Sequence, residues 1–352
     1  MITNSNSNLL KIDLDSIAQD VSPFIDQLKQ QSVLITGGTG FVGSCLINSL
    51  VHLDAVFQLN AQFFILSRNP EKLYLKSPGL KSCNNIQLIT SDIRKLQLTD
   101  KKFDYVIHAA GSPEPNLIKN QPLEVFDIIA NGTKHLLNLL KDSEIKNTLI
   151  LSSSLVHGSS QKYERFLNEN AQVAGNPYNS FGSYIEAKRT AEFYSSVYTR
   201  LFSMNISVAR CFHLIGPFIP LDSGNLMGDI ISSALHGSDL SIQADRNTIR
   251  SYLYCSDFVV WLLKILLKGS NQVYNVGNNV PCTLNEIVDQ MRKKYNTNII
   301  FPNQASSSDS FGIIADTTLA RNELELKVNV SLDEAIKRTV EWHQKFIKNE
   351  TL

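Results

Sequence analysis

Short apolar runs alternate with helix-length segments between residues 33 and 210. Each of six such runs predicts a strand: 33–36, 63–66, 87–90, 105–109, 148–152 and 207–210. Several of these runs are apolar throughout instead of alternating with polar residues, which suits a sheet that helices cover on both faces. The pattern therefore predicts an α/β fold built on a doubly wound parallel sheet with right-handed crossovers.

The pattern changes on both sides of this region. Four apolar residues recur at helical spacing near the N-terminus: Leu10, Leu14, Ile17 and Val21. Residues 1–30 are therefore expected to form a helical flank, and residues 31–215 the sheet domain. After residue 215 the spacing of apolar runs becomes uneven, which predicts a smaller, mainly C-terminal lobe over residues 216–352. A partial return of this last segment to the sheet domain is left open.

The first predicted strand runs directly into a glycine-rich turn that precedes a helix. The turn holds glycines at positions 37, 38, 40 and 43, and the last three fit the spacing GxGxxG. Backbone amides of a turn without side chains can approach a pyrophosphate, which the positive end of the following helix attracts. A glycine-rich turn without a ligand is the alternative, but the strand and the helix favour a dinucleotide site. The predicted contacts are Gly37, Gly40, Phe41, Val42 and Gly43.

Further cofactor contacts are expected where the next strands end, because open α/β sheets bind ligands beyond the carboxyl ends of their strands. They are Ser67, Arg68, Asp92, Ile93, Ala109, Ala110 and Gly111. No acid follows the second strand to bind the ribose hydroxyls, and Arg68 offers a cation to a 2'-phosphate. NADP(H) is therefore predicted in preference to NAD(H), although a solvated loop charge is the other interpretation of Arg68. Asp92 suits the adenine amino group, and it would equally well cap a turn beside Arg94.

Tyr184 and Lys188 lie four residues apart, which places both on one face of a predicted helix. A nearby ammonium and the nicotinium charge favour the phenolate form of a tyrosine, so this pair can move a proton to or from a sugar hydroxyl. Many such pairs are only structural. The upstream dinucleotide site and a serine cluster after the strand at 148–152 favour the catalytic interpretation.

Composition favours small-molecule chemistry. The 33 basic and 33 acidic residues give a formal net charge of +0, so neither nucleic acid nor an anionic membrane is indicated as a partner. The five scattered cysteines and seven histidines show no metal-ligand spacing. Reduced thiols, the absence of an export signal and apolar runs too short to cross a bilayer predict a cytoplasmic protein.

The motifs, in this order, resemble those of the extended short-chain dehydrogenase/reductase family, the NAD-dependent epimerase/dehydratase enzymes of nucleotide sugars. The resemblance spans roughly residues 31–345 and includes the glycine turn, Asp92-Ile93 and the segment 108–111. It implies a Rossmann-like fold with the catalytic residues Ser153, Tyr184 and Lys188. Ser153 is chosen by aligning the segment 156–158 on the family's Val-Tyr-Gly, with Ser152 and Ser154 as close competitors.

The same resemblance implies a role for each residue of the triad. Ser153 would hydrogen-bond the reacting sugar oxygen, Tyr184 would move the proton, and Lys188 would bind the nicotinamide ribose and lower the pKa of the tyrosine. The partners it implies are a nucleotide-sugar substrate and, through helices that flank the Tyr-Lys segment, a second copy of the chain in a homodimer. Glycan biosynthesis is the implied pathway.

Substrate contacts are also implied by the resemblance. The segment 210–217 resembles the family's Arg-x-Phe-Asn-x-x-Gly-Pro, with His213 where asparagine is usual, and Arg250 matches the arginine that binds the diphosphate. The predicted substrate-binding residues are Ser154, His157, His213, Asn225 and Arg250. A histidine satisfied in the core and a surface arginine in an ion pair are the alternatives for His213 and Arg250.

The residues at positions 154 and 155 limit which reactions of the family this chain can catalyse. Dehydratases of the family carry an Asp-Glu pair just after the catalytic hydroxyl residue, and here these positions are Ser154 and Leu155, which cannot shuttle protons during elimination. Reduction of an NDP-4-keto-6-deoxyhexose and 4-epimerisation with retained NAD remain, and resemblance to the dTDP-4-keto-6-deoxyglucose reductase branch favours reduction. A non-catalytic dinucleotide sensor is disfavoured because the triad is intact.

Overall fold

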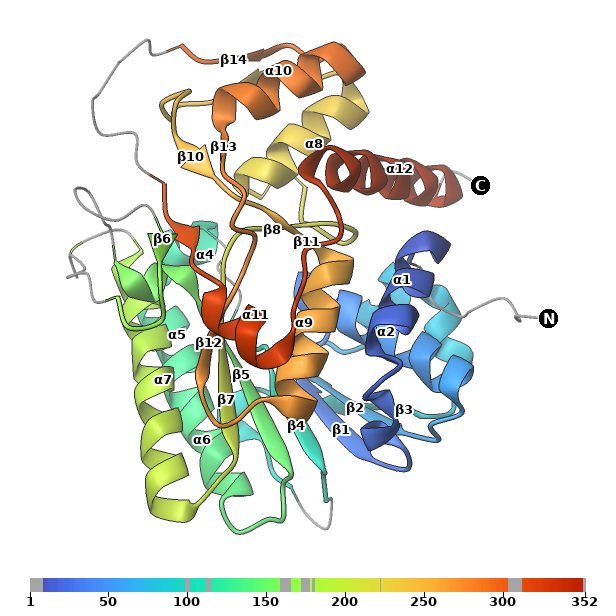
Figure 1. The fold of residues 1–352 in the computed structure, drawn as a ribbon, viewed down its shortest axis with the longest axis vertical. Helices are drawn as coiled ribbons and strands as arrows, with labels where there is room; N and C mark the ends of the chain where they lie inside the picture. The colour runs from blue at the N-terminus through green and yellow to red at the C-terminus, as the bar shows by residue number, and fades with distance from the viewer. Residues whose placement is uncertain are drawn as a thin grey trace.

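A seven-stranded parallel sheet forms the centre of the computed structural model, which describes residues 9–98, 102–111, 115–158, 166–171, 178, 181–221, 223–302 and 312–350 (Figure 1). The strand order is β12-β7-β5-β4-β1-β2-β3, and every neighbouring pair is parallel. The strands are β1 (Ser32–Thr36), β2 (Gln62–Ser67), β3 (Ile86–Thr90), β4 (Tyr105–His108), β5 (Asn147–Ser153), β7 (Ile206–Cys211) and β12 (Val273–Val276). All six predicted strands are confirmed, as is the Rossmann-like, doubly wound fold.

Alternate residues of the central strands enter two different apolar cores. Val33 and Ile35 of β1 pack in the core that includes α2 (Phe41–Phe57) and α9 (Cys255–Lys268). Leu34, between them, faces the opposite core, with α6 (Gly132–Leu140) and α7 (Gly182–Phe202). Both faces of the sheet are therefore covered, which explains why its strands lack the alternation of a half-solvated sheet.

The described part of the N-terminal segment forms a helix and a 3₁₀ turn that pack on the elements of the sheet domain. Helix α1 (Lys11–Val21) lies against α9 and α2, and the 3₁₀ turn η1 (Ile25–Leu28) follows it. Its Leu14, Ile17 and Val21 are almost completely buried. The apolar face of α1 therefore covers the outer side of the layer that α2 and α9 form on the sheet.

The C-terminal part of the chain supplies most of a second layer of elements above the sheet in Figure 1. Its helices are α8 (Leu226–His236), α10 (Leu284–Tyr295) and α12 (Leu332–Glu350). Its short strands pair as β8 (Leu214–Ile215) with β11 (Leu253–Tyr254), β9 (Leu240–Ser241) with β14 (Ile299–Ile300), and β10 (Ile249–Arg250) with β13 (Cys282–Thr283).

The boundary at residue 216 stays a prediction, because the chain crosses it more than once. Helix α9 packs on β5 and β7, and β12 is an edge strand of the main sheet. No strand is predicted for residues 273–276 from the sequence, although they form β12. Their pairing with β7 is long-range, so local periodicity carried no signal for it.

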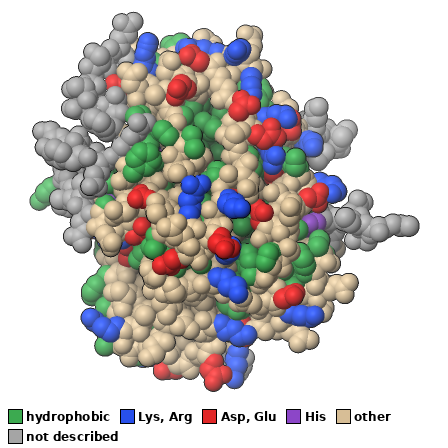
Figure 2. All heavy atoms as spheres, in the orientation of Figure 1, with side chains coloured by type: hydrophobic (Ala, Val, Ile, Leu, Met, Phe, Trp, Pro, Cys, Tyr) green, Lys and Arg blue, Asp and Glu red, His purple; other side chains and the backbone are tan. Residues whose placement is uncertain are grey.

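The remaining elements are short connections at the edges of these layers. They are α3 (Lys72–Lys76), η2 (Pro78–Ser82), η3 (Ile93–Lys95), α4 (Pro115–Asn120), α5 (Pro122–Phe126), the π-helical turn η4 (Asp127–Asn131), η5 (Ser154–His157), β6 (Phe166–Leu167), β15 (Ile314–Ala315) and α11 (Thr318–Leu324). Acidic and basic side chains are interspersed over the face drawn in Figure 2. Within the described ranges, no helix has the length and apolar character needed to cross a membrane.

Candidate functional site

The glycine turn between β1 and α2 is packed too tightly to carry side chains. Gly37 has a φ of +70°, and a Cβ placed on it would lie 2.7 Å from the Ala109 backbone oxygen. A Cβ on Gly43 would lie 2.4 Å from the Cα of Gly38. The turn therefore presses against the end of β4, and Gly40 forms the N-cap of α2. This is a backbone cradle at a positive helix end, as a pyrophosphate requires.

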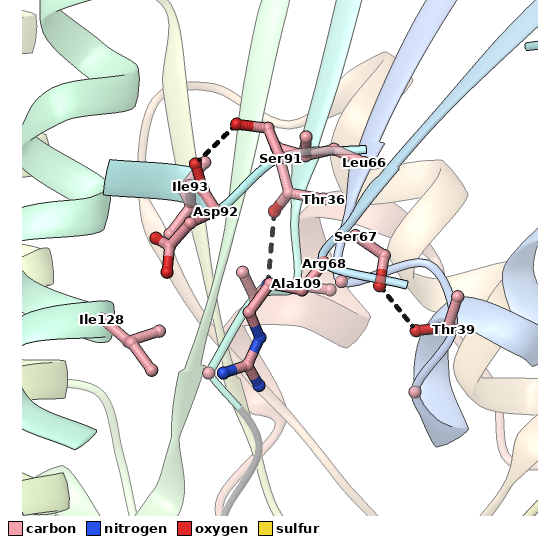
Figure 3. Close-up of a pocket in the computed structure, with 14 residues that line it drawn as sticks. Thr36, Thr39, Leu66, Ser67, Arg68, Ser91, Asp92, Ile93, Ala109 and Ile128 are labelled. Carbon is pink, nitrogen blue, oxygen red and sulfur yellow. Dashed lines mark hydrogen bonds between the residues drawn. The ribbon is translucent and has the colours of Figure 1, made fainter. Parts of the chain in front are cut away.

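A cavity of about 180 Å³ opens beside this turn, along the carboxyl ends of β1 to β4 (Figure 3). Nine of the predicted cofactor contacts line it: Gly37, Gly40, Ser67, Arg68, Asp92, Ile93, Ala109, Ala110 and Gly111. Five further residues complete the lining, which the sequence analysis missed as contacts: Thr36, Thr39, Leu66, Ser91 and Ile128. The other predicted cofactor contacts do not line the cavity: Phe41, Val42 and Gly43 lie in the first turn of α2, and Tyr184 and Lys188 lie on α7.

A buried histidine links the ends of β1 and β4 beside this cavity to helix α6. His108 Nδ1 is 2.7 Å from the Thr36 hydroxyl, and Nε2 is 3.0 Å from the Thr133 hydroxyl. Because Thr133 donates its own proton to the Ile129 carbonyl oxygen, it accepts from Nε2–H, and Thr36 donates to Nδ1. Thr36 in turn accepts from the Ala110 amide. Burial lowers the pKa of His108 to about 3, so a neutral imidazole of one tautomer holds β4 against β1.

Asp92 caps a turn and also lines the cavity, while its contact with an adenine amino group stays a prediction. Its carboxylate accepts from the backbone amide of Arg94 at 2.9 Å and forms an ion pair with the Arg94 guanidinium at 2.6 Å. Arg94 also pairs with Glu124 and Asp127. Hydrogen bonding to Arg94 lowers the pKa of Asp92 to about 2, which keeps it a charged acceptor at neutral pH.

The predicted catalytic residues converge where β5 and α7 meet. The side chains of Ser153 and Tyr184 are hydrogen-bonded, and Ser153 Oγ also accepts from the Leu155 amide at 3.2 Å. Lys188, one helical turn from Tyr184, donates to the Leu151 carbonyl oxygen at 2.7 Å. All three side chains are buried. Four-residue spacing on α7 therefore places phenol and ammonium on the same face, directed at β5.

Burial acts in opposite directions on the two ionisable members of this group. It raises the pKa of the Tyr184 phenol above its ordinary value, and the bond to Ser153 lowers it in part. It lowers the pKa of Lys188 to about 8. Without a bound cofactor the tyrosine is therefore a protonated phenol at neutral pH, and the ammonium remains mostly charged.

Ser152 and Ser154 are the two other candidates for the catalytic serine, and neither has a described hydrogen bond to Tyr184. Ser152 donates to the Glu192 carboxylate at 2.5 Å, and Glu192 also holds Arg210 in an ion pair at 2.8 Å. Ser154 begins the 3₁₀ turn η5 and is buried. These contacts favour Ser153, whose side chain bonds Tyr184, as the serine of the triad.

The predicted substrate-binding residues fall into two groups. His157 is buried, with Nδ1 3.2 Å from the Ala171 carbonyl oxygen and Nε2 3.3 Å from Asn275 Oδ1, so it links η5 to β12. Asn225 caps α8 by accepting from the Gly228 amide at 3.1 Å. Both side chains thus have a structural contact as well as the predicted one.

His213, between β7 and β8, is a neighbour of Arg250 on β10. The Nδ1 of His213 is buried without a partner in the described structure, and its ring centroid lies 5.5 Å from that of Tyr252. Burial, with a contribution from the Arg250 charge, lowers the pKa of His213 to about 3. Arg250 donates to the Ile249 carbonyl oxygen and is partly exposed. A neutral imidazole therefore stands beside a guanidinium here.

Comparison with known proteins identifies the family. A model of the NAD dependent epimerase/dehydratase family matches residues 33–277, which is more than half of the chain. The protein belongs to this family. The predicted family resemblance is therefore confirmed, and the chain is a nicotinamide-dependent enzyme of the epimerase/dehydratase type. The glycine cradle and the cavity at the strand ends fit the dinucleotide of that family.

Two named relatives of this epimerase/dehydratase chain come from Arabidopsis thaliana. UDP-glucuronic acid decarboxylase 5 is 28% identical over 268 residues, covering 76% of this chain and 75% of that protein. UDP-glucuronic acid decarboxylase 1 is 26% identical over 326 residues, covering 92% and 72%. Neither relative is named as a reductase, so the reductase branch stays a prediction.

Solved structures of similar fold include an epimerase from Methanothermobacter thermautotrophicus, with a TM-score of 0.77, 19% identity and coverage of 96% of this chain and 97% of that one. The UDP-glucose 4-epimerase of Thermotoga maritima, solved with UDP-glucose, gives 0.75 at 21% identity, covering 90% and 99%. Bordetella bronchiseptica WbmF in complex with NAD+ gives 0.73 at 20% identity, covering 92% and 95%. These likenesses confirm the fold.

Among the described residues, no cluster of three or more His, Cys, Asp or Glu side chains forms a metal site.

Proposed function

We propose that the protein is a nucleotide-sugar oxidoreductase that transfers hydride at C4 of an NDP-hexose, with reduction of an NDP-4-keto-6-deoxyhexose by NADPH as its reaction. The hydrogen bond between Ser153 and Tyr184, beside the buried Lys188, carries this proposal. It brings together three groups that the reaction needs: a hydrogen-bond donor for the C4 oxygen (Ser153), a proton source (Tyr184) and a cation (Lys188). The nicotinamide supplies the hydride when bound.

In this mechanism Ser153 donates a hydrogen bond to the ketone oxygen, and Tyr184 gives its phenol proton to that oxygen as the alcohol forms. Lys188 stabilises the resulting phenolate by its charge. Burial favours this direction, because it raises the pKa of Tyr184 and so keeps the proton on the phenol until the oxygen needs it. Oxidation would begin from a phenolate instead.

The residues after Ser153 argue against reactions that need a further acid or base. Ser154 and Leu155 occupy η5, and Leu155 packs against the apolar cluster around α7. Neither exchanges protons near neutral pH, so elimination of water lacks its catalyst. The remaining alternative within the proposal is 4-epimerisation with retained NAD, which uses the same triad in both directions.

The substrate class is supported by the relatives. Their names include UDP-glucuronic acid decarboxylase, and UDP-glucose is bound in one structure of similar fold. We propose that a nucleoside diphosphate binds between the sheet ends and the C-terminal lobe, with Arg250, Asn225 and His213 as contacts. A guanidinium offers a diphosphate two parallel charge-assisted hydrogen bonds.

The test is an incubation of the pure protein with dTDP-4-keto-6-deoxyglucose and NADPH or NADH, followed by cofactor absorbance and by NMR of the product. Stoichiometric oxidation with a new C4 alcohol is expected. If no cofactor is oxidised, the reductase assignment is wrong, and C4 inversion of UDP-, dTDP-, GDP- and CDP-hexoses without net cofactor use would support the epimerase. Release of CO₂ from UDP-glucuronate would instead place the chain with its named relatives.

A matched variant separates catalysis from binding. Tyr184→Phe removes one oxygen atom at a buried position and should lower turnover by about 10²–10⁴-fold while cofactor binding persists. Turnover that survives this change would contradict the mechanism. It would also reopen the possibility of a dinucleotide sensor with a contaminating activity.

The homodimer is part of the proposal as well. Helices α5 and α7 pack against each other, and the large apolar side chains that they expose include Leu123 (84% exposed) and Phe193 (61% exposed). Light scattering after size-exclusion chromatography should give twice the mass of the chain. Leu123→Lys combined with Phe193→Lys should give a monomer.

A further inference from the structure

Arg94 lies beside the dinucleotide cavity without lining it. Its side chain makes five hydrogen bonds, all of them to carboxylate oxygens. Nε and Nη2 donate to Asp92 at 2.9 Å and 2.6 Å, Nη2 and Nη1 donate to Glu124 at 2.8 Å and 3.0 Å, and Nη1 donates to Asp127 at 2.5 Å. Since a guanidinium has no further N–H to donate, the three carboxylates hold its plane in one orientation.

The bonds of Arg94 join two segments that form one wall of the cavity. Asp92 is the N-cap of η3, and Asp127 is the first residue of η4. Each is followed in the sequence by an isoleucine that lines the cavity, Ile93 and Ile128. Figure 3 draws Asp92, Ile93 and Ile128 on the same side of this cavity. The guanidinium therefore fixes the position of this wall from behind.

The bonds to Arg94 leave Asp92 little free capacity to accept hydrogen bonds. Oδ1 accepts from the backbone amide and from Nε of Arg94, both at 2.9 Å, and Oδ2 accepts from Nη2. Because a carboxylate offers about four lone-pair positions, roughly one remains, on Oδ2. A charged acceptor that is fixed in this way takes an N–H donor of a ligand and repels a carbonyl oxygen at the same place.

We propose that Arg94, held from behind by Glu124 and Asp127, is a positioning residue that sets the selectivity of the dinucleotide site for a 6-amino purine over a 6-oxo purine. It does so by fixing Asp92 with one acceptor position left for the amino group. The inference rests on the predicted adenine contact of Asp92 in the cofactor part of the proposed function. It adds that three side chains outside the cavity determine how well that contact discriminates between bases.

A purely structural role of Arg94 gives a different expectation. If Arg94 only joined η3 to η4, its loss would weaken the binding of adenine and hypoxanthine dinucleotides by the same factor. If it positions Asp92, the loss falls mainly on the adenine dinucleotide, and the two ligands bind more nearly alike. The ratio of the two dissociation constants therefore separates the roles.

The experiment titrates the full-length protein, without sugar, with NADH and with reduced nicotinamide hypoxanthine dinucleotide, and follows nicotinamide fluorescence. The unaltered protein should bind NADH about tenfold or more tightly. Arg94→Met should lower this ratio to about threefold or less. Arg94→Lys should lower it nearly as far, because an ammonium cannot reproduce the planar set of bonds. Lys95→Met is the matched control: Lys95 is an exposed cation of the same turn, and its loss should leave the ratio unchanged.

A double variant reaches Asp92 only through the guanidinium. Glu124→Gln combined with Asp127→Asn keeps Arg94 but removes two of its anions, and neither residue lines the cavity. This protein should also show a lower ratio, and it replaces Arg94→Met if that variant does not fold.

Three results would overturn the proposal: a ratio near one in the unaltered protein, an unchanged ratio in Arg94→Met, or an unchanged ratio in the double variant. The same comparison with NADPH and its hypoxanthine analogue removes any dependence on the preference between NAD(H) and NADP(H). Since no sugar is present, the outcome is also independent of which sugar the enzyme reduces or whether it reduces one.

Discussion

The Lys188 ammonium lies 5.8 Å from the centroid of the Tyr184 ring, and both side chains are buried. Titratable groups face Lys188 from several elements: the neutral His108 is on β4, the Cys211 thiol is on β7, and the Glu192 carboxylate is on its own helix. Burial outweighs the others and lowers the pKa of Lys188 to about 8. The charge that supports the phenolate is thus set close to the pH at which the enzyme would work.

This relationship predicts how the reaction depends on pH. Below its pKa of about 8 Lys188 is an ammonium, and above it the amine is neutral, so kcat/KM for the cofactor should be level at neutral pH and fall as pH rises beyond 8. The profile is measured at constant ionic strength with saturating sugar. A profile that stays flat past pH 9 would show that the charge of Lys188 is not required.

Glu192 should tune that profile. Tyr184, Lys188 and Glu192 follow at four-residue spacing on one face of α7, and the Glu192 charge raises the pKa of Lys188 against burial. Glu192→Gln should therefore move the fall in kcat/KM to lower pH, by up to about one unit. Glu186→Gln is the control on the same helix, where the carboxylate pairs with Arg189. If Glu192→Gln lowers the rate without shifting the pH at which kcat/KM falls, Glu192 acts only by holding Ser152 and Arg210 in position.

The parts of this site that the sequence predicted are those with a local signal. The glycine turn and the ends of β1 to β4 follow from apolar runs and glycine spacing, because parallel strands bring their carboxyl ends to one edge. Tyr184 and Lys188 follow from helical spacing. Each of these rests on neighbours a few residues away in the chain.

The parts that were missed depend on contacts between distant segments. Thr39 and Ser67, whose hydroxyls lie 3.0 Å apart at the cavity, are 28 residues apart in the sequence, and His108 is 72 residues from Thr36. The edge strand β12 is only four residues long and pairs with β7 across more than sixty residues, so it has too little periodicity to be recognised.

The glycine turn gives a prediction that needs no cofactor. A Cβ on Gly43 would meet the Gly38 backbone at 2.4 Å, where no flexible side chain can move aside, whereas on Gly40 the nearest atom is the Gly37 oxygen at 3.4 Å. Gly43→Ala should therefore lower the thermal midpoint by several degrees, corresponding to roughly 1–3 kcal/mol, and Gly40→Ala much less. Differential scanning calorimetry of the cofactor-free protein makes the comparison. Equal midpoints would mean that the turn is looser than its contacts imply.

The N-terminal helix provides a prediction about stability. The completely buried Asp13 on α1 accepts from Tyr254 at 2.7 Å and pairs with Arg338 of α12 at 2.8 Å. Removing the guanidinium in Arg338→Met leaves this carboxylate buried without its cation, which should cost about 3–5 kcal/mol of the free energy of unfolding. Urea denaturation followed by circular dichroism measures it.

A neighbouring lysine and a double variant make the cause of that loss identifiable. Lys337 also lies on α12 and bonds Glu334, yet it is exposed and does not reach α1, so Lys337→Met should change the free energy of unfolding by less than about 1 kcal/mol. Asp13→Asn combined with Arg338→Met removes both charges and should recover part of the stability, because the main cost is the orphaned carboxylate and not the lost attraction. If the double variant is less stable than Arg338→Met alone, Asp13 stabilises the docking of α1 through its bond with Tyr254, and the ion pair is secondary.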